Sequence, residues 1–255
     1  MTFMQERREQ VQGGQLNRVE HIPLSVALSP CGTRHTLSVG THSLTLTTPT
    51  AAEQGPAYEL AKRSLDVVVS AAVLIALFPV FVIVALMIFL EDQGPIFYYQ
   101  TRVGKNGKHF RFYKFRSMVP NADQIKAQLQ ASNEANGPIF KMRNDPRITR
   151  VGRFIRRYSI DELPQLLSVL RGEMSLIGPR PHLPKEVADY DERQENRLNV
   201  QPGLLCFREV LGRSNMTFEQ WVELDLLYVE YRSWRTDMAI LGRVLPAVLS
   251  AEGAY

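Results

Sequence analysis

The sequence predicts a mainly α-helical protein with a small β element, attached to a membrane by a helix that bends at a proline. Three features predict this fold class: a long apolar run that contains Pro79, apolar residues at helical spacing in the second half of the chain, and short stretches of alternating polar and apolar residues. Of the 255 residues, 45% are hydrophobic and 22% are charged, as in ordinary globular domains. We therefore expect a membrane helix at residues 59–92 and a folded domain at residues 93–255.

Residues 1–58 are polar and rich in Thr, Ser, Gly and Gln. Their one regular pattern is the weak alternation HTLSVGTHSLTLTT, which favours a pair of strands around Gly40. We expect most of the segment to be a mobile N-terminal extension.

From Val67 to Leu90 the chain carries no charged residue. As a straight helix this run would reach about 36 Å at about 1.5 Å per residue, enough to cross the hydrocarbon core of a membrane. A buried helix of a soluble core fits poorly, because it would need apolar neighbours on every side. A cleaved signal peptide is also disfavoured, because a long polar segment precedes the run.

Two details favour a segment that enters and leaves through the same leaflet. Pro79 lies near the middle of the run, where it removes a helical hydrogen bond and bends the axis. Basic residues flank the run on both sides: Lys62 and Arg63 before it, and Arg102, Lys105, Lys108, Arg111, Lys114 and Arg116 after it. Because positive charge marks the cytoplasmic side, we expect a re-entrant helix, with a true span as the alternative.

Turn and breaker signals place the next elements. The stretch RVGKNGKHFRFYKFRSM turns at Asn106-Gly107 and predicts a short hairpin or strand. Residues 121–137 read as a polar helix that stops at Gly137-Pro138. A basic helix at 147–157, a helix from about 161 to 171 and a GPRP loop at 178–181 should follow.

Two helices are expected near the C-terminus. Thr217 and Gln220 have the spacing of a capping box at the start of the first, and Pro246 interrupts the second, at about 235–250. Aromatic side chains on these helices suit either a membrane interface or a core: Trp221, Tyr228, Tyr231 and Trp234.

The formal net charge is only +4, but cations are concentrated between residues 141 and 157. They are Lys141, Arg143, Arg147, Arg150, Arg153, Arg156 and Arg157. On a helix, Arg150, Arg153 and Arg157 share a face opposite an apolar one. Such a face can be solvated, can contact anionic lipid, or can hold a diphosphate.

The carboxylates of Asp161 and Glu162 follow the cations directly. A carboxylate beside guanidinium groups can hold a divalent metal or attack phosphorus. A structural interpretation also fits, because Ser159 and Glu162 have capping-box spacing and Asp161 could cap a helix that has Pro164 in its first turn. The catalytic and the structural interpretation are compatible. Near a positive helix end, Asp161 should stay ionised and act as a nucleophile.

Other sites are disfavoured by spacing. Cys31 and Cys206 lie far apart, and the five histidines lack the spacing of metal ligands, so neither a disulfide framework nor a zinc site is predicted. The cations accompany a membrane segment and no recognised nucleic-acid-binding pattern, so a nucleic-acid partner is not expected.

Taken together, three segments resemble the bacterial sugar transferases, which are monotopic phosphoglycosyl transferases: KFRSM (114–118), DPRITRVGRFIRRYSIDELPQLLSVLRGEMSLIGPRP (145–181) and the ending LDLLYVEYRSW...AILGRVLPAVLSAEGAY. The resemblance covers about residues 60–255. It implies a monotopic protein with a re-entrant helix kinked at Pro79 and amphipathic interfacial helices, in the bacterial inner membrane. Its catalytic domain would lie on the cytoplasmic face, in contact with membrane lipid.

The resemblance also implies a reaction. A sugar-1-phosphate, more specifically a hexose-1-phosphate, would pass from a UDP-sugar to polyprenyl (undecaprenyl) phosphate with release of UMP, at the start of exopolysaccharide or related glycan assembly. Asp161 matches the nucleophile that forms a covalent phosphosugar, and Glu162 matches the carboxylate that ligates Mg²⁺. Cations expected to bind substrate are Lys114, Arg116, Arg153, Arg156, Arg180 and Arg213. A homo-oligomer is left open.

The chain departs from the family pattern at two places. Phe78 stands where a serine often precedes the kink proline. Leu204-Leu205-Cys206-Phe207-Arg208 stands where related hexose transferases often read Gly-Leu-Trp-Gln, so this loop does not indicate the sugar. The alternative function is a membrane-tethered scaffold whose basic face binds anionic lipid or partners without catalysis, which gives no reason for the Asp161-Glu162 pair.

Overall fold

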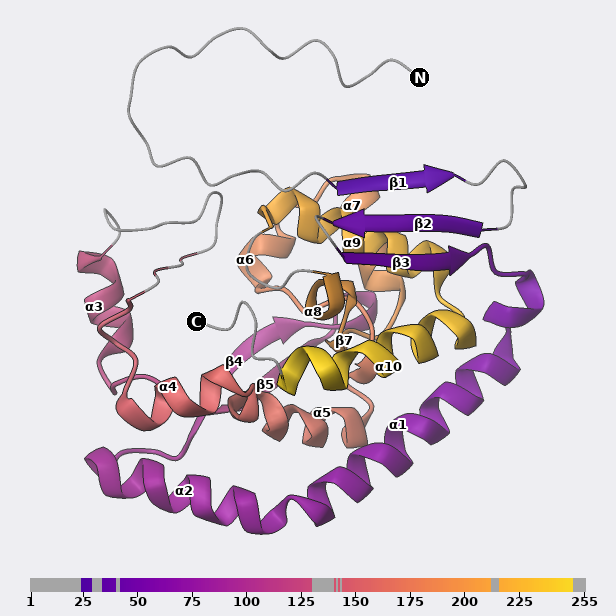
Figure 1. Cartoon of the computed structure of the whole chain (residues 1–255). Helices are drawn as coiled ribbons and strands as arrows, with labels where there is room; N and C mark the ends of the chain where they lie inside the picture. The colour runs from indigo at the N-terminus through magenta and orange to yellow at the C-terminus, as the bar shows by residue number, and fades with distance from the viewer. Residues whose placement is uncertain are drawn as a thin grey trace, which may run out of the picture.

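The computed structural model describes residues 24–28, 34–39, 42–129, 140, 142, 144–211 and 216–249. Its most extended feature is a bent pair of helices, α1 (Pro56–Ala76) and α2 (Phe78–Asp92), which runs along one side of the molecule (Figure 1). The two axes differ by 59°, and Pro79 lies in the first turn of α2, where its missing N–H removes no helical hydrogen bond. The bend expected at Pro79 is therefore confirmed.

Within the described ranges, α1 and α2 taken together have the length and composition to cross a membrane, and no helix has them alone. One side of α2 packs on the rest of the chain through Val84 and Ile88, which are 3% and 2% exposed. Elsewhere on α1 and α2, large apolar side chains are exposed, among them Ile75, Phe78 and Leu90. Large exposed apolar side chains gathered on one pair of helices favour a contact with lipid or with another protein.

A buried polar cluster fixes α1 to helices α9 (Phe218–Tyr231) and α10 (Trp234–Leu249). The carboxylate of Asp237 accepts hydrogen bonds from Lys62 Nζ at 2.8 Å, Tyr58 Oη at 2.9 Å and Tyr228 Oη at 2.7 Å. All four residues are less than a tenth exposed. Because a buried charge needs a partner, this cluster fixes where α1 meets the rest of the chain.

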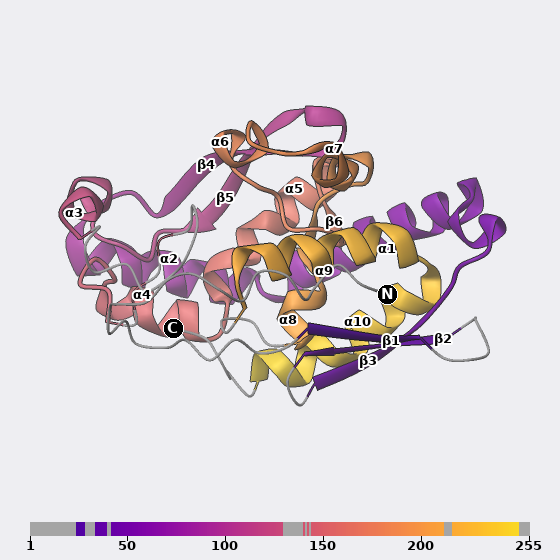
Figure 2. The same ribbon diagram turned by 90° about the horizontal axis from the view of Figure 1, so that it is seen from above.

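Three antiparallel strands precede the bent pair: β1 (Leu24–Leu28), β2 (Arg34–Val39) and β3 (His42–Thr47). Figure 2 shows this sheet beside α10. Leu37, Val39, Leu44 and Leu46 alternate along β2 and β3 and are at most 1% exposed, packed into the main core. The strand pair predicted around Gly40 is confirmed.

Within residues 1–58, the alternating apolar residues of β2 and β3 are buried in the main core. The expectation of a mobile N-terminal extension stays a prediction. Residues 1–23 lie outside the described part of the chain.

The hairpin predicted at Asn106-Gly107 is also confirmed. Strands β4 (Phe97–Val103) and β5 (His109–Phe115) pair antiparallel and are joined by the short helix η2 (Lys105–Gly107). Asn106 and Gly107 have φ values of 56° and 74°, a conformation that these two residue types adopt most readily. Strand β5 packs along the 3-10 helix η4 (Ile160–Gln165).

The remaining elements are short. They are η1 (Ala51–Gln54), α3 (Ala122–Gln128), α4 (Arg150–Arg157), α5 (Leu166–Arg171), β6 (Ser175–Ile177), α6 (Pro184–Val187), α7 (Glu192–Glu195), η5 (Asn196–Asn199), β7 (Gly203–Leu205) and α8 (Phe207–Leu211). Strands β6 and β7 pair in parallel. The architecture is mainly helical with small sheets, as predicted.

Several predicted helices differ in detail. The helix expected at 161–171 is divided into the 3-10 helix η4, which contains Pro164, and the α-helix α5. Helix α3 covers the first part of the polar helix expected at 121–137, and residues 130–137 lie outside the described part. Helix α10 continues through Pro246, which was expected to interrupt it. The capping box of Thr217 and Gln220 is confirmed at the start of α9.

Candidate active site

A cavity of about 820 Å³ lies between the β4–β5 hairpin, η4, the loop at 178–181 and helices α8 and α9. Its wall carries four carboxylates, of which Asp161 and Glu162 are adjacent in the chain, and six cations: Asp123, Asp161, Glu162, Glu209, Lys114, Arg102, Arg116, Arg156, Arg180 and Arg208. A cavity of this size with convergent charged groups is typical of a small-molecule site. The cations favour an anionic ligand.

The turn from α4 into η4 brings both carboxylates to the wall. Ser159 connects the two helices with a φ of 55°, a left-handed conformation that is costly for a residue other than glycine. Its side chain makes no capping hydrogen bond, so the structural role proposed for the Ser159–Glu162 spacing is not realised. Asp161 is only 7% exposed at this turn.

Glu162 is held by two cations from distant parts of the chain. Lys114 Nζ donates to its Oε1 at 2.6 Å, and Arg180 Nη2 donates to the same oxygen at 2.7 Å. Lys114 Nζ also lies 4.0 Å from Asp161 Oδ2. The two cations and two carboxylates thus form one charged cluster at the cavity wall.

The environments of the two carboxyl groups shift their pKa values in opposite directions. Burial raises the pKa of Asp161, and the neighbouring charge of Glu162 adds to the effect against the opposing pull of Lys114 and Arg156. Burial acts in the same direction on Glu162, but Arg180 and Lys114 outweigh it and hold the pKa of Glu162 well below its usual value. The expectation that Asp161 stays ionised rests on the nearby cations, and burial acts against them.

The backbone of the loop that carries Arg180 passes very close to β7. A Cβ atom on Gly203 would lie 2.0 Å from Gly178 N, so only glycine fits there. Gly178 N donates to Leu205 O at 2.9 Å, and Gly203 N donates to Pro179 O at 2.8 Å. This close approach places Arg180 between the hairpin and α8.

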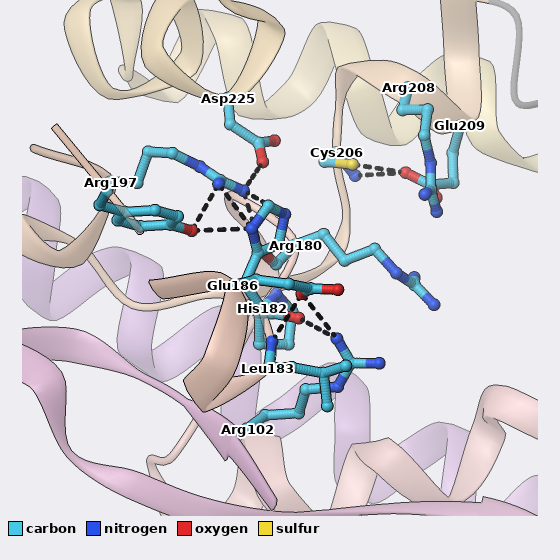
Figure 3. A network of polar contacts seen from close by, with 12 residues as sticks. Arg102, Arg180, His182, Leu183, Glu186, Arg197, Cys206, Arg208, Glu209 and Asp225 are labelled. Atoms are coloured by element: carbon cyan, nitrogen blue, oxygen red, sulfur yellow. Dashed lines mark hydrogen bonds and ion pairs between the residues drawn. The ribbon is translucent and has the colours of Figure 1, made fainter. Parts of the chain in front are cut away.

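Arg197 supports the same loop from behind (Figure 3). Its guanidinium is paired with Asp225, contacts the ring nitrogens of His182 at 2.8 and 2.9 Å, and donates to Arg180 O at 3.3 Å. Burial, with the charge of Arg197 next, lowers the pKa of His182 well below its usual value, so the ring is neutral at neutral pH. On the hairpin side, Arg102 Nη1 donates to Pro181 O at 3.0 Å.

The cavity contains most but not all of the residues that the sequence indicated. Lys114, Arg116, Arg156 and Arg180 line it with the two carboxylates. Arg153 lies on the exposed side of α4, away from the wall. Arg213 lies outside the described residues.

Arg197 and the Arg208–Glu209 pair were missed as parts of the site. The sequence indicated Arg208 only as part of the loop at 204–208, which differs from the pattern of related hexose transferases. Their partners are set by the tertiary fold, and no local pattern marks them.

The carboxylates of the cavity wall are the candidate ligands for magnesium. No cluster of three or more His, Cys, Asp or Glu side chains that could hold a metal occurs in the described part of the chain. Mg²⁺ needs less from the protein, because one or two carboxylates with substrate phosphate oxygens and water complete its shell. Asp161 and Glu162 are adjacent at the wall, and among the described residues Glu162 Oε2 has only a long, 3.4 Å contact from Arg180 Nη1. This pair fits Mg²⁺ when the substrate supplies phosphate oxygens.

Known proteins match this chain over most of its length. The profile of the family described as "Bacterial sugar transferase" matches residues 57–251. The galactosyl transferase CpsE of Streptococcus agalactiae is 46% identical over 165 residues, which are 64% of this chain and 37% of that protein. The exopolysaccharide production protein ExoY of Sinorhizobium fredii is 39% identical over 200 residues, 77% of this chain and 88% of ExoY.

A third relative is the undecaprenyl-phosphate galactose phosphotransferase of Salmonella typhimurium. It is 42% identical over 207 residues, which are 76% of this chain and 41% of that protein. The chain therefore spans less than half of CpsE and of the Salmonella protein and most of ExoY.

Proposed function

Because the chain belongs to the bacterial sugar transferase family, we propose that it transfers a hexose-1-phosphate from a UDP-sugar to polyprenyl phosphate and releases UMP. The names of two relatives specify galactose, which supports a hexose. The name of ExoY supports a role in exopolysaccharide production. The observation that carries the proposal is the Asp161–Glu162 pair, clustered with Lys114 and Arg180 on the wall of a cavity that has room for a nucleotide sugar.

In the proposed first step, an oxygen of ionised Asp161 attacks the β-phosphorus of the UDP-sugar. The bond from that phosphorus to the bridging oxygen breaks, and UMP leaves with the oxygen and the electron pair. Lys114 and Arg180 lie where they can neutralise the charge on the phosphoryl oxygens. The enzyme then holds a sugar phosphate as an acyl phosphate on Asp161.

In the second step, an oxygen of polyprenyl phosphate attacks the same phosphorus and displaces the Asp161 carboxylate. The product is a polyprenyl-diphosphate sugar, and the enzyme returns to its starting state. Mg²⁺, held by Glu162 and phosphate oxygens, would neutralise charge on the transferring group. Val73 of α1 and the half-exposed Phe97 line the cavity, which supports access for a lipid-linked acceptor from the side of the bent pair.

We further propose that α1 and α2 enter and leave the cytoplasmic leaflet of the bacterial inner membrane. The exposed apolar side chains of the pair and the cations on both of its flanks support this placement. The active site would then face the cytoplasm, where UDP-sugars are available.

The test is UMP release by detergent-purified protein from a panel of UDP-sugars, with polyprenyl phosphate and Mg²⁺. Asp161→Asn should abolish release, while Asp189→Asn, the same change at an exposed position outside the cavity, should leave it intact. Absence of UMP release from every donor by well-folded protein would favour the non-catalytic, lipid-binding scaffold.

A further inference from the structure

The cavity has a second charged cluster, at the start of α8. Glu209 Oε1 accepts from Arg208 Nε at 3.2 Å and from Arg208 Nη2 at 2.6 Å. Glu209 Oε2 accepts from Cys206 N at 3.1 Å and from Cys206 Sγ at 2.7 Å. A carboxylate has about four lone-pair sites, so Glu209 has little capacity left for a ligand and acts to hold Arg208.

Trp221 fixes the same guanidinium from one face. The Arg208 guanidinium carbon lies 4.7 Å from the centre of the Trp221 ring, a stacking distance that favours the cation. Burial and the charge of Arg180 both act against that cation, and Glu209 outweighs them, so the pKa of Arg208 stays above its usual value. The side chain is 17% exposed, on the cavity wall.

The free edge of Arg208 can only donate hydrogen bonds. Within the described ranges, its Nε and Nη2 have hydrogen-bond partners and its Nη1 has none. Figure 3 shows Arg180 and Arg208 reaching toward the same side, and both line the cavity. Two arginines fixed next to each other suit an anion with several oxygens, and with Glu209 saturated they offer no acceptor for a sugar hydroxyl.

We propose that Arg208, held by Glu209 and Trp221, binds the phosphate of the nucleotide donor that is not transferred and that leaves with the nucleoside. The inference rests on the proposed function, which places the transferred phosphate at Asp161, Lys114 and Arg180. Arg208 lies on the α8 side of Arg180, where the adjoining phosphate of a diphosphate can reach it. It therefore contributes to binding of the donor and of the released monophosphate alike.

The probes are UMP, inorganic pyrophosphate and uridine, whose binding to the full-length protein is measured by calorimetry. Arg208→Gln should weaken the binding of UMP and pyrophosphate by about tenfold to a hundredfold, the range expected for losing a charge-assisted hydrogen bond. Uridine, which has no phosphate, should bind as before. Arg208→Lys should recover part of the loss, and Glu209→Gln should weaken UMP binding less than Arg208→Gln does.

Arg193→Gln is the matched control, because Arg193 is exposed, paired with Glu223 and absent from the cavity wall. Unchanged UMP binding in Arg208→Gln, equal losses for UMP and uridine, or no binding of either phosphate probe to the wild type would each overturn the inference. Turnover is measured beside binding. Wild-type protein that binds UMP through Arg208 but releases none from any UDP-sugar would contradict the proposed function alone.

Discussion

Asp161 and Glu162 are adjacent in the chain, but Lys114 Nζ lies 2.6 Å from Glu162 Oε1 and 4.0 Å from Asp161 Oδ2. Arg180 is also paired with Glu162. The negative charge of the Glu162 carboxylate is thereby balanced by two cations, which lower its pKa. The burial of Asp161 is offset less by nearby cations, so its pKa is raised. Two carboxyl groups whose pKa values are driven apart can take different roles, one as a fixed counter-charge and the other as the reacting group.

Asp161→Asn should raise the melting temperature at neutral pH while it abolishes UMP release. The pKa of Asp161 is raised in the folded protein, so its contribution to stability is complete only below the unfolded value of 3.8 and is lost as the pH rises through the folded value. At neutral pH an uncharged amide of the same shape should be better tolerated there. Thermal unfolding at neutral pH measures the difference in melting temperature between Asp161→Asn and wild type. A lower melting temperature for the variant would contradict the prediction.

Glu162→Gln should have the opposite effect on stability. Its pKa is held well below 4.5, so its contribution is present above pH 4.5 and is lost as the pH falls through the folded value. The variant leaves Lys114 and Arg180 without their shared partner, at a loss of about 1–3 kcal/mol. Denaturant unfolding at neutral pH should show a lower midpoint for the variant than for wild type, and the difference between the two midpoints should become smaller in acid. Equal midpoints at neutral pH would contradict a stabilising role for Glu162 as the shared partner of Lys114 and Arg180.

Local signals predicted the elements that are formed by neighbouring residues. The bend at Pro79, the turn at Asn106-Gly107 and the cap at Thr217 each follow from the backbone chemistry of one or two residues. The family resemblance implied that Lys114 and Arg180 belong to the same site as Asp161 and Glu162, and both cations are paired with Glu162.

Burial and partner choice could not be predicted in the same way. The pKa of Asp161 depends on how η4 packs against β5, and Arg197 meets Asp225 only once η5 and α9 pack together. Tyr228 was equally consistent with a membrane interface and with a core until its hydroxyl was found hydrogen-bonded to Asp237, at 1% exposure.

Asp237→Asn should destabilise the attachment of α1. Its carboxylate is the shared acceptor for Lys62, Tyr58 and Tyr228, and its loss leaves the buried Lys62 cation without its ion-pair partner. Breaking a buried pair from one side costs roughly 3–5 kcal/mol. Protease digestion should cut the variant faster near α1. Asp189→Asn is the exposed control, and equal cutting of both variants would show that the cluster does not hold the helix.

Arg197→Lys should lower kcat strongly and change the melting temperature little. Lysine keeps the charge beside Asp225 but lacks the planar fork that also reaches His182 and Arg180 O. A loosely held Arg180 should reduce kcat by about tenfold to a hundredfold, because small misplacements of a charged group are costly in catalysis. A loss of stability with normal kcat in the remaining folded protein would assign Arg197 a purely structural role.

Cys206 should resist alkylation in the folded protein. Burial and the nearby Glu209 raise the pKa of its thiol well above the usual value, and the thiolate is the form that reacts. In a Cys31→Ser background, iodoacetamide at neutral pH should label the native protein far more slowly than the denatured protein, as followed by mass spectrometry. Because Cys206 Sγ donates to the carboxylate that holds Arg208, labelling also reports on that support. Rapid labelling of native protein would mean that the loop opens and does not hold Arg208 in a fixed position.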